Sequence, residues 1–218
     1  LRENKVMSLK TRFGNLGNIL DFDNLTEENI YVLESPILTN SQFKKFKKFF
    51  SKKVKVIDCT FDIKSSLKDR IEAIREETET AVREGSTTLI LSDKNISNQK
   101  ASIPSILIVG AVHSHLVKHA LRGYCSLNVE CSDALDTHSF AVLIGVGATT
   151  VNPYLAIDSI YQRFEKKLFG KSDFESCVVK FKKSIDAGLL KIMSKMGISV
   201  ISSYRGGCNF EAVGLSRA

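Results

Sequence analysis

The sequence contains no tryptophan, only three prolines, and five cysteines that form no C-x-x-C pair. Serine and glycine interrupt every apolar run before it reaches the roughly 20 residues that a membrane-spanning helix requires. The first residues, Leu-Arg-Glu-Asn-Lys, are charged and are not followed by the apolar segment of a signal peptide. These absences argue against a membrane protein and a secreted disulfide scaffold. We expect an intracellular protein in a reducing compartment, with reduced and mostly buried thiols.

The extent of the chain gives two further expectations. With 218 residues, of which 43% are apolar and 25% charged, the chain is long enough to bury one sizeable core, so we expect one domain. The sequence begins with Leu1 where an initiator methionine would stand, and Phe210–Leu215 resembles the opening of an element that does not continue. We therefore expect a piece cut from a longer protein.

The net charge of +7 is concentrated between Lys44 and Lys55, where lysines are interleaved with phenylalanines. A basic, aromatic segment of this kind is one way to bind nucleic acid. However, Phe43, Phe46 and Phe50 follow the spacing i, i+3, i+7, which places them on one inward face of a helix. The favoured interpretation is therefore a core-facing helix capped by Ser41 with its lysines in solvent. A nucleic-acid-binding module remains the alternative.

Short β-type runs alternate with helical segments along most of the chain, which predicts an α/β fold with a largely parallel sheet. We expect a brief strand at residues 31–33 and further strands at 54–61, 87–91, 125–130, 148–151 and 198–202. Helices are expected at 66–85, 103–121, 137–145, 154–169 and 173–196, with a shorter helical piece starting at Thr26. The five β runs from residue 54 onward are too few to close an eight-stranded barrel. We expect an open sheet or an incomplete barrel.

Three histidines form the pattern His113-x-His115-x3-His119. On a helix, His115 and His119 share a face while His113 points away from them. No carboxylate lies nearby in the sequence, so we expect no metal site. The helix at 66–85 carries an acidic face that we interpret as solvated surface: Glu72, Glu76, Glu77 and Glu79.

The segment Gly145-x-Gly147 follows an apolar run, as the glycines of a dinucleotide-binding loop do. The third glycine of that motif is replaced by Thr150, and Pro153 prevents an immediate helix. Tight turn packing is the better interpretation, and a nucleotide-dependent enzyme ranks last among the hypotheses.

No nucleophile elbow and no activated cysteine is present. Asp133 and Asp136 lie in a polar turn that we expect to cap helices. We assign no catalytic residue.

Eight blocks of sequence, in order and spanning nearly all of the chain, resemble the central domain of glutamate synthase. They are Met7–Asn15, Ser35–Leu38, Leu89–Asp93, Val109–His113, Phe140–Gly145, Asn152–Ala156, Leu189–Ser199 and Ser203–Gly206.

The resemblance implies a role between two catalytic domains. In that family an amidotransferase domain with an N-terminal cysteine releases ammonia from glutamine. A later domain with FMN and a three-iron (3Fe-4S) cluster adds the ammonia to 2-oxoglutarate and reduces the imine. The central domain resembles a rudimentary form of the flavin domain's TIM barrel and helps to form the ammonia tunnel.

The resemblance also sets expectations about cofactors, partners and location. It implies no cofactor in this piece, and electrons from ferredoxin or from a reductase with FAD and NAD(P)H. The partners are the amidotransferase and FMN domains of the same chain, and the compartment is the cytoplasm or a plastid. Neither a membrane nor nucleic acid is expected as a partner.

The resemblance implies three parts of the chain: an arm at residues 1–40, an α/β core at 41–203, and the start of the connection to the FMN domain at 204–218. The last part begins with Tyr204, Arg205 and Gly206, which resemble the entry into the flavin domain.

Met7 and Ser8, in the Met-Ser-Leu motif, resemble residues along the tunnel near the flavin. Ser35, before Pro36, matches a serine or threonine of the same path. The chain departs from the family pattern at Ser139, at Val146 and at residues 207–209.

Overall fold

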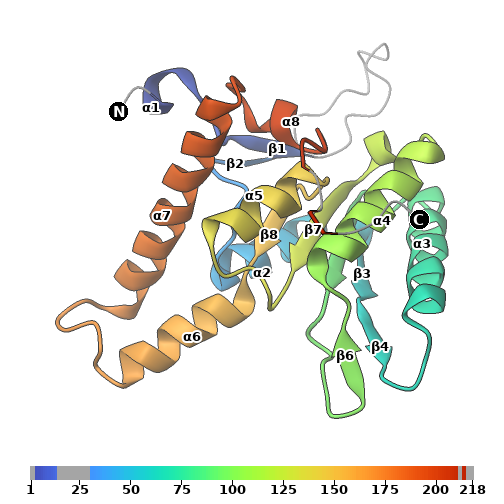
Figure 1. Cartoon of the computed structure of the whole chain (residues 1–218), viewed down its shortest axis with the longest axis horizontal. Coiled ribbons are helices and arrows are strands. Elements are labelled where there is room, and N and C mark those ends of the chain that lie inside the picture. Colours follow the sequence, from blue (N-terminus) through green and yellow to red (C-terminus); the bar gives the residue numbers. More distant parts are fainter. Residues whose placement is uncertain (1–2, 14–29, 211–212, 215–218) are drawn as a thin grey trace.

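The computed structural model describes residues 3–13, 30–210 and 213–214. Its centre is a four-stranded parallel sheet in the order β3-β5-β7-β8 (Figure 1). The strands are β3 (Val54–Asp58), β5 (Thr88–Ser92), β7 (Ser126–Glu130) and β8 (Thr150–Asn152). Helices connect successive strands, which confirms the predicted α/β class and the largely parallel sheet. The sheet stays open, as an incomplete barrel requires.

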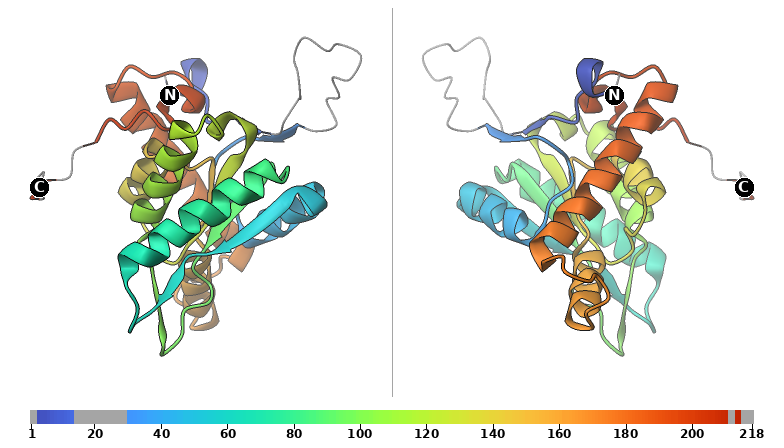
Figure 2. Two further views of the ribbon diagram at one scale, coloured as in Figure 1. Left: turned by 90° about the vertical axis from the view of Figure 1, so that its right-hand side faces the viewer. Right: turned by 90° about the vertical axis from the view of Figure 1, so that its left-hand side faces the viewer.

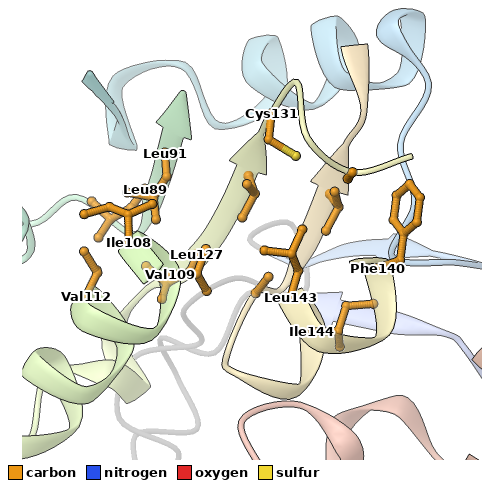
Figure 3. Packing of buried hydrophobic residues seen from close by; sticks show 14 of the residues in the cluster. Leu89, Leu91, Ile108, Val109, Val112, Leu127, Cys131, Phe140, Leu143 and Ile144 are labelled. Carbon is orange, nitrogen blue, oxygen red and sulfur yellow. The ribbon is translucent and has the colours of Figure 1, made fainter. Parts of the chain in front are cut away.

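Three helices cover one face of this sheet: α3 (Leu67–Arg83), α4 (Ser105–Lys118) and α5 (Thr137–Gly145). The register aligns Ile57, Leu91, Val129 and Val151 across the four strands, and all four are buried in the main core. Figure 3 shows part of this core between the strands and the helices, including Leu89, Leu91, Ile108, Val109, Val112, Leu127, Cys131, Phe140, Leu143 and Ile144.

The opposite face of the sheet is covered by α2 (Asn40–Phe50), the lysine- and phenylalanine-rich helix. Phe43, Phe46 and Phe50 are buried together with Ile90 of strand β5. Ile90 points away from the main core because successive side chains of a strand alternate between its faces. The predicted inward stripe is confirmed, and the three phenylalanines are not available to stack on nucleic-acid bases.

The predicted cap of this helix was wrong by two residues. Thr39, and not Ser41, is the N-cap: its hydroxyl accepts from the amide of Gln42, whose side chain in turn accepts from the amide of Thr39. This reciprocal capping box satisfies two amides that the first helical turn leaves without partners.

The expected strand at 54–61 is two strands. Asp58 ends β3, because its carboxylate accepts hydrogen bonds from the amide and hydroxyl of Thr60 and turns the chain. The chain continues as β4 (Thr60–Asp62), which pairs antiparallel with β6 (Lys100–Ser102). The sequence pattern did not reveal β6, which has only three residues.

The predicted strand at 198–202 was wrong. Only Val200 forms a β-bridge, with Ser8, and the next residues form the short helix α8 (Ile201–Tyr204). A single helical turn allows Ile201 and Tyr204 to reach the core together, and both are at most 1% exposed. Burial of this i, i+3 pair favoured the helix over the local β pattern.

The helix expected from residue 103 begins at Ser105. Ile103 remains extended, and its amide donates to the carbonyl of Cys59. Asp133 caps α4 from a distant turn, where its carboxylate accepts from the amide of Ser105 at 2.9 Å. Asp136 is the N-cap of α5 and accepts from the amide of Ser139. The capping roles predicted for both aspartates are confirmed.

The N-terminal part contains α1 (Glu3–Val6) and a two-stranded antiparallel sheet of β1 (Thr11–Phe13) and β2 (Tyr31–Leu33). The strand predicted at 31–33 is therefore confirmed. The helical piece expected at Thr26 lies outside the described residues. The short 3-10 helices η3 (Ser51–Lys53) and η4 (Arg122–Tyr124) precede β3 and β7.

Two helices follow the last strand of the sheet, α6 (Tyr154–Glu165) and α7 (Phe174–Lys195). Asp173 begins α7 as its N-cap, as the sequence predicted. Within the described ranges, none of the helices combines the length and apolar character needed to span a membrane.

The cysteines of the described chain are all free, and three of them, Cys59, Cys125 and Cys131, are buried. The prediction of mostly buried cysteines is confirmed.

Phe46 should be the main anchor of α2. The substitution Phe46→Ala is expected to lower the free energy of unfolding by about 3–5 kcal/mol, because a fully buried ring is lost and a cavity remains. Urea unfolding monitored by circular dichroism measures the loss. The control Phe49→Ala, on the same helix at a side chain that is 47% exposed, should cost clearly less. Equal losses would show that α2 is not held by this inward stripe.

Candidate functional site at the junction of the first and last segments

The segment around Ser8 is hydrogen-bonded to residues 199–201, which lie near the other end of the described chain. The amide of Ser8 donates to the carbonyl of Ser199 at 2.8 Å, and the amide of Ile201 donates to the carbonyl of Ser8 at 3.0 Å. Met7 is half-buried and packs against the main core. Figures 1 and 2 show α1 and α8 beside the end of α7. The structure thus brings Met7 and Ser8 to the segment that leads into Tyr204.

Residues 204–208, called the exit segment from here on, are fixed along the end of α5. The Tyr204 hydroxyl donates to the carbonyl of Ala141 at 3.0 Å, and burial raises the pKa of this phenol to about 12. Farther along, the amide of Gly206 donates to Ile144 at 3.1 Å, and that of Cys208 donates to Gly145 at the same distance. Tyr204 and Gly206 therefore hold the exit segment against the core.

His113 fills the space between two glycines of different segments. A Cβ atom at Gly147 would overlap its ring, and one at Gly206 would lie 2.9 Å from its Cε1 atom. Both glycines have positive φ, +126° and +69°, which side chains disfavour. The tight turn packing predicted for Gly145-x-Gly147 is confirmed. His113 does point away from His115 and His119, into this junction.

Arg122 holds the His113 ring in place. Its Nε donates to His113 Nδ1 at 3.1 Å, and its other nitrogens donate to the carbonyls of Cys125 at 2.6 Å and Gly147 at 2.9 Å. Burial, and then the charge of Arg122, lowers the pKa of His113. The imidazole is therefore held neutral, with Nδ1 as the acceptor.

Three arginines, Arg12, Arg122 and Arg205, line a cavity of about 210 Å³ at the amino ends of the strands, together with Thr87, Gly123, Tyr124, Cys125, Ser126 and Thr149. Two nitrogens of Arg205, Nε and Nη2, are buried and make no hydrogen bond within the described structure. Burial and the neighbouring charge of Arg122 lower the pKa of Arg205 to about 10. The junction is thus strongly positive and suits an acidic group.

Ser35, the third predicted tunnel position, is held by other contacts. Its hydroxyl donates to Asp186 of α7 at 2.6 Å and accepts from the amide of Ile37 at 3.1 Å. It borders a larger cavity of about 950 Å³ that is also lined by residues of α2, α6 and α7. The structure therefore joins Met7 and Ser8 to the exit segment but places Ser35 at a separate cavity.

The carboxyl edge of the sheet, where open α/β folds commonly bind ligands, carries a network of acidic and hydroxyl side chains. Asp93 is 2% exposed and accepts from the amide and hydroxyl of Ser132 at 2.9 and 2.6 Å. Glu130 accepts from Ser92 at 2.7 Å and pairs with Lys94 at 2.8 Å. Both oxygens of Glu130 and Oδ2 of Asp93 are engaged by neighbours, whereas Oδ1 of Asp93 is buried without a hydrogen-bond partner in the described structure. The negative charge of these carboxylates disfavours a phosphate group.

Glu79 is the residue that sequence reasoning missed. It was expected on a solvated face, but its Oε2 atom lies 2.7 Å from His115 Nε2 and 2.6 Å from His119 Nδ1. Hydrogen bonds from Arg83 and from the two histidines lower its pKa to about 2. The spacing within each helix was visible in the sequence, whereas the contact between α3 and α4 depends on how the two helices pack.

The contact of His113 with Gly147 should make this turn intolerant of a side chain. We expect Gly147→Ala to lower the free energy of unfolding by at least about 1–3 kcal/mol, because φ is positive and the methyl group meets the ring. Gly110→Ala is the matched control: Gly110 lies inside α4 with open space around it, so this variant should be stabilised by about 0.5–1 kcal/mol. Urea midpoints measure both, and a neutral Gly147→Ala would contradict this packing.

The solved structures identify the architecture. A flavocytochrome b2 variant with benzoylformate matches 82% of this chain and 42% of its own, with a TM-score of 0.50 and 16% sequence identity. At this identity the likeness concerns the fold alone. That enzyme has a TIM barrel, so the open sheet described above corresponds to part of a barrel.

The curated relatives are glutamate synthases. The chain is 55% identical to the NADPH-dependent large chain of Azospirillum brasilense, over 100% of this chain and 14% of that protein. It is 40% identical to the large chain of Bacillus subtilis, with coverages of 100% and 14%, and 38% identical to the ferredoxin-dependent enzyme of Pyropia yezoensis, with coverages of 99% and 15%. The chain thus spans about a seventh of the length of these proteins.

The sequence model of the glutamate synthase central domain matches residues 1–216. Together with the relatives, this match shows that the chain belongs to the glutamate synthase central domain family.

Proposed function

We propose that this chain is the connecting domain of a glutamate synthase, joining the amidotransferase domain to the FMN domain and helping to enclose the path of ammonia between them. The observation that carries the proposal is the pairing of Ser8 with residues 199–201. It fixes the segments that lead into and out of the domain on one side of the core, so the domains on either side are held in a defined relation.

The proposed path has a simple chemical reason. Ammonia released into water is protonated and lost as a nucleophile, so its transfer requires exclusion of solvent. Met7 supplies a flexible apolar side chain next to the junction, and Ser8 fixes the backbone beside it. Ser35 borders the second cavity, where its bonds to Asp186 and Ile37 hold the segment that precedes α2.

We place the boundaries as the resemblance implies. Residues 1–40 form the arm from the amidotransferase domain, 41–203 the core, and 204–218 the start of the connection to the FMN domain. The buried Tyr204 anchors the beginning of this connection. The positive cavity of Arg12, Arg122 and Arg205 lies at the same junction and suits a carboxylate of a neighbouring domain.

The residues of the described chain do not fit FMN or an iron–sulfur cluster. Iron–sulfur clusters are bound by cysteine thiolates, whereas burial raises the pKa of the three buried thiols, Cys59, Cys125 and Cys131, and disfavours their thiolate form. The carboxyl edge of the sheet presents acidic side chains in place of a phosphate site. FMN and the 3Fe-4S cluster are therefore assigned to the part of the enzyme outside this chain.

The electron donor is also assigned to the rest of the enzyme. It is either ferredoxin or a reductase with FAD and NAD(P)H, because relatives of both kinds match nearly the whole of this chain. The corresponding compartment is the cytoplasm or a plastid.

Met7→Ala in the full-length enzyme tests the proposed path. Truncation opens the wall beside the junction, so glutamine-dependent glutamate formation should fall and free ammonia should appear, while synthesis from added ammonium is retained. Val117→Ala, an exposed position on α4, is the control. Unchanged nitrogen transfer in Met7→Ala would remove Met7 from the path.

The assignment of FMN to another domain is tested separately. Titration of the 218-residue chain with FMN, followed by flavin fluorescence quenching, should show no stoichiometric binding, because the residues described at the carboxyl edge of the sheet are acidic and disfavour a phosphate group. Tight one-to-one binding would show that this domain itself holds the flavin.

A further inference from the structure

Glu79, His115 and His119 bring three metal-binding atoms together from two neighbouring helices. Glu79 belongs to α3, His115 belongs to α4, and His119 is the residue that ends α4. Their ligand atoms, Oε2, Nε2 and Nδ1, all lie within 4.8 Å of one another. We propose that these three side chains bind a divalent transition-metal ion of the zinc class, which cross-links α3 to α4.

The geometry is close to what a zinc ion requires. Ligands about 2.0–2.1 Å from a tetrahedral ion lie about 3.3–3.4 Å from each other. The carboxylate oxygen now lies 2.7 and 2.6 Å from the two nitrogens, so the side chains have to separate by less than about 1 Å to admit the ion. The i, i+4 spacing of the histidines already places them on one face of α4.

The outer surroundings suit a bound ion. Arg83 donates from Nε and Nη2 to the other oxygen of Glu79, Oε1, at 2.9 and 2.7 Å. This leaves Oε2 for the ion and fixes the carboxylate, as outer-shell partners do in metal sites. The side chain of Arg83 is 57% exposed, so solvent screens its repulsion of a cation.

Access and ligand chemistry define the kind of ion. The three side chains are 13%, 21% and 35% exposed for His115, Glu79 and His119, which leaves room for entry and for a water molecule as fourth ligand. Two imidazoles and one carboxylate favour zinc, copper or nickel, whereas magnesium and calcium prefer oxygen ligands alone. The site is separate from the proposed ammonia path and stands independently of it.

Zinc binding by the full-length enzyme tests the proposal. Equilibrium dialysis against zinc ions, with metal counted by mass spectrometry, should give one zinc fewer per chain in His119→Ala and in Glu79→Gln than in the wild type. The affinity should fall at least about tenfold, the smallest loss usual even for outer-shell partners. A tenfold excess of magnesium should not displace the ion.

Matched variants control for the loss of a histidine or a glutamate as such. His138→Ala and Glu76→Gln remove the same side chains from exposed positions and should retain the zinc. Equal zinc contents in His119→Ala and the wild type would overturn the proposal, and so would equal losses in His119→Ala and His138→Ala.

Two measurements guard against variants that fail to fold. Zinc should raise the thermal midpoint of the wild type but not that of His119→Ala, whose midpoint and circular dichroism without zinc are compared first. The second is a difference spectrum: the zinc X-ray absorption of the wild type minus that of Glu79→Gln, once this variant is shown by circular dichroism to be folded, should show two imidazole ligands. A difference spectrum without imidazole scattering would contradict the site.

Discussion

An open parallel sheet must be covered on both faces, and this constraint determines how the domain is built. Helices α3, α4 and α5 cover one face, as they would on the outside of a barrel. The other face would line the interior of a complete barrel, and here Phe43, Phe46 and Phe50 of α2 cover it. The barrel wall is thus preserved while its interior is filled. The domain therefore has the scaffold of part of a barrel, with the inner face of its sheet covered by α2.

The contacts that matter for function therefore lie at the edge of the core. Ser8 is hydrogen-bonded to the segment before α8, and Tyr204 and Gly206 are hydrogen-bonded to α5. His113 lies between Gly147 and Gly206, and Arg122 donates a hydrogen bond to its ring. Apart from the hydrogen bond between Arg122 and His113, these contacts join parts of the chain that are far apart in sequence. A domain whose segments near both ends are bound together in this way is suited to the connecting role proposed above.

Periodicity and capping residues were sufficient to predict most of the fold, because these signals are local. The inward stripe of α2, the capping by Asp133 and Asp136, and the strands expected at 31–33, 87–91, 125–130 and 148–151 follow directly from them. The failures have tertiary causes: Asp58 turns the chain through its own side chain, and residues 201–204 become helical so that Ile201 and Tyr204 can both be buried. The cluster around Glu79 could not be predicted for the same reason, because it depends on how α3 packs against α4, which local sequence patterns do not reveal.

The central claim is that the segment around Ser8 and residues 199–208 form one unit with the core in the intact enzyme. Hydrogen exchange of the full-length protein tests it directly at the amides of Ser8, Ile201 and Gly206, which donate across this junction. The account predicts that these amides are protected as strongly as those of β5 and β7 and open together with them. Exchange as fast as that of an exposed turn, with the central strands still protected, would contradict it.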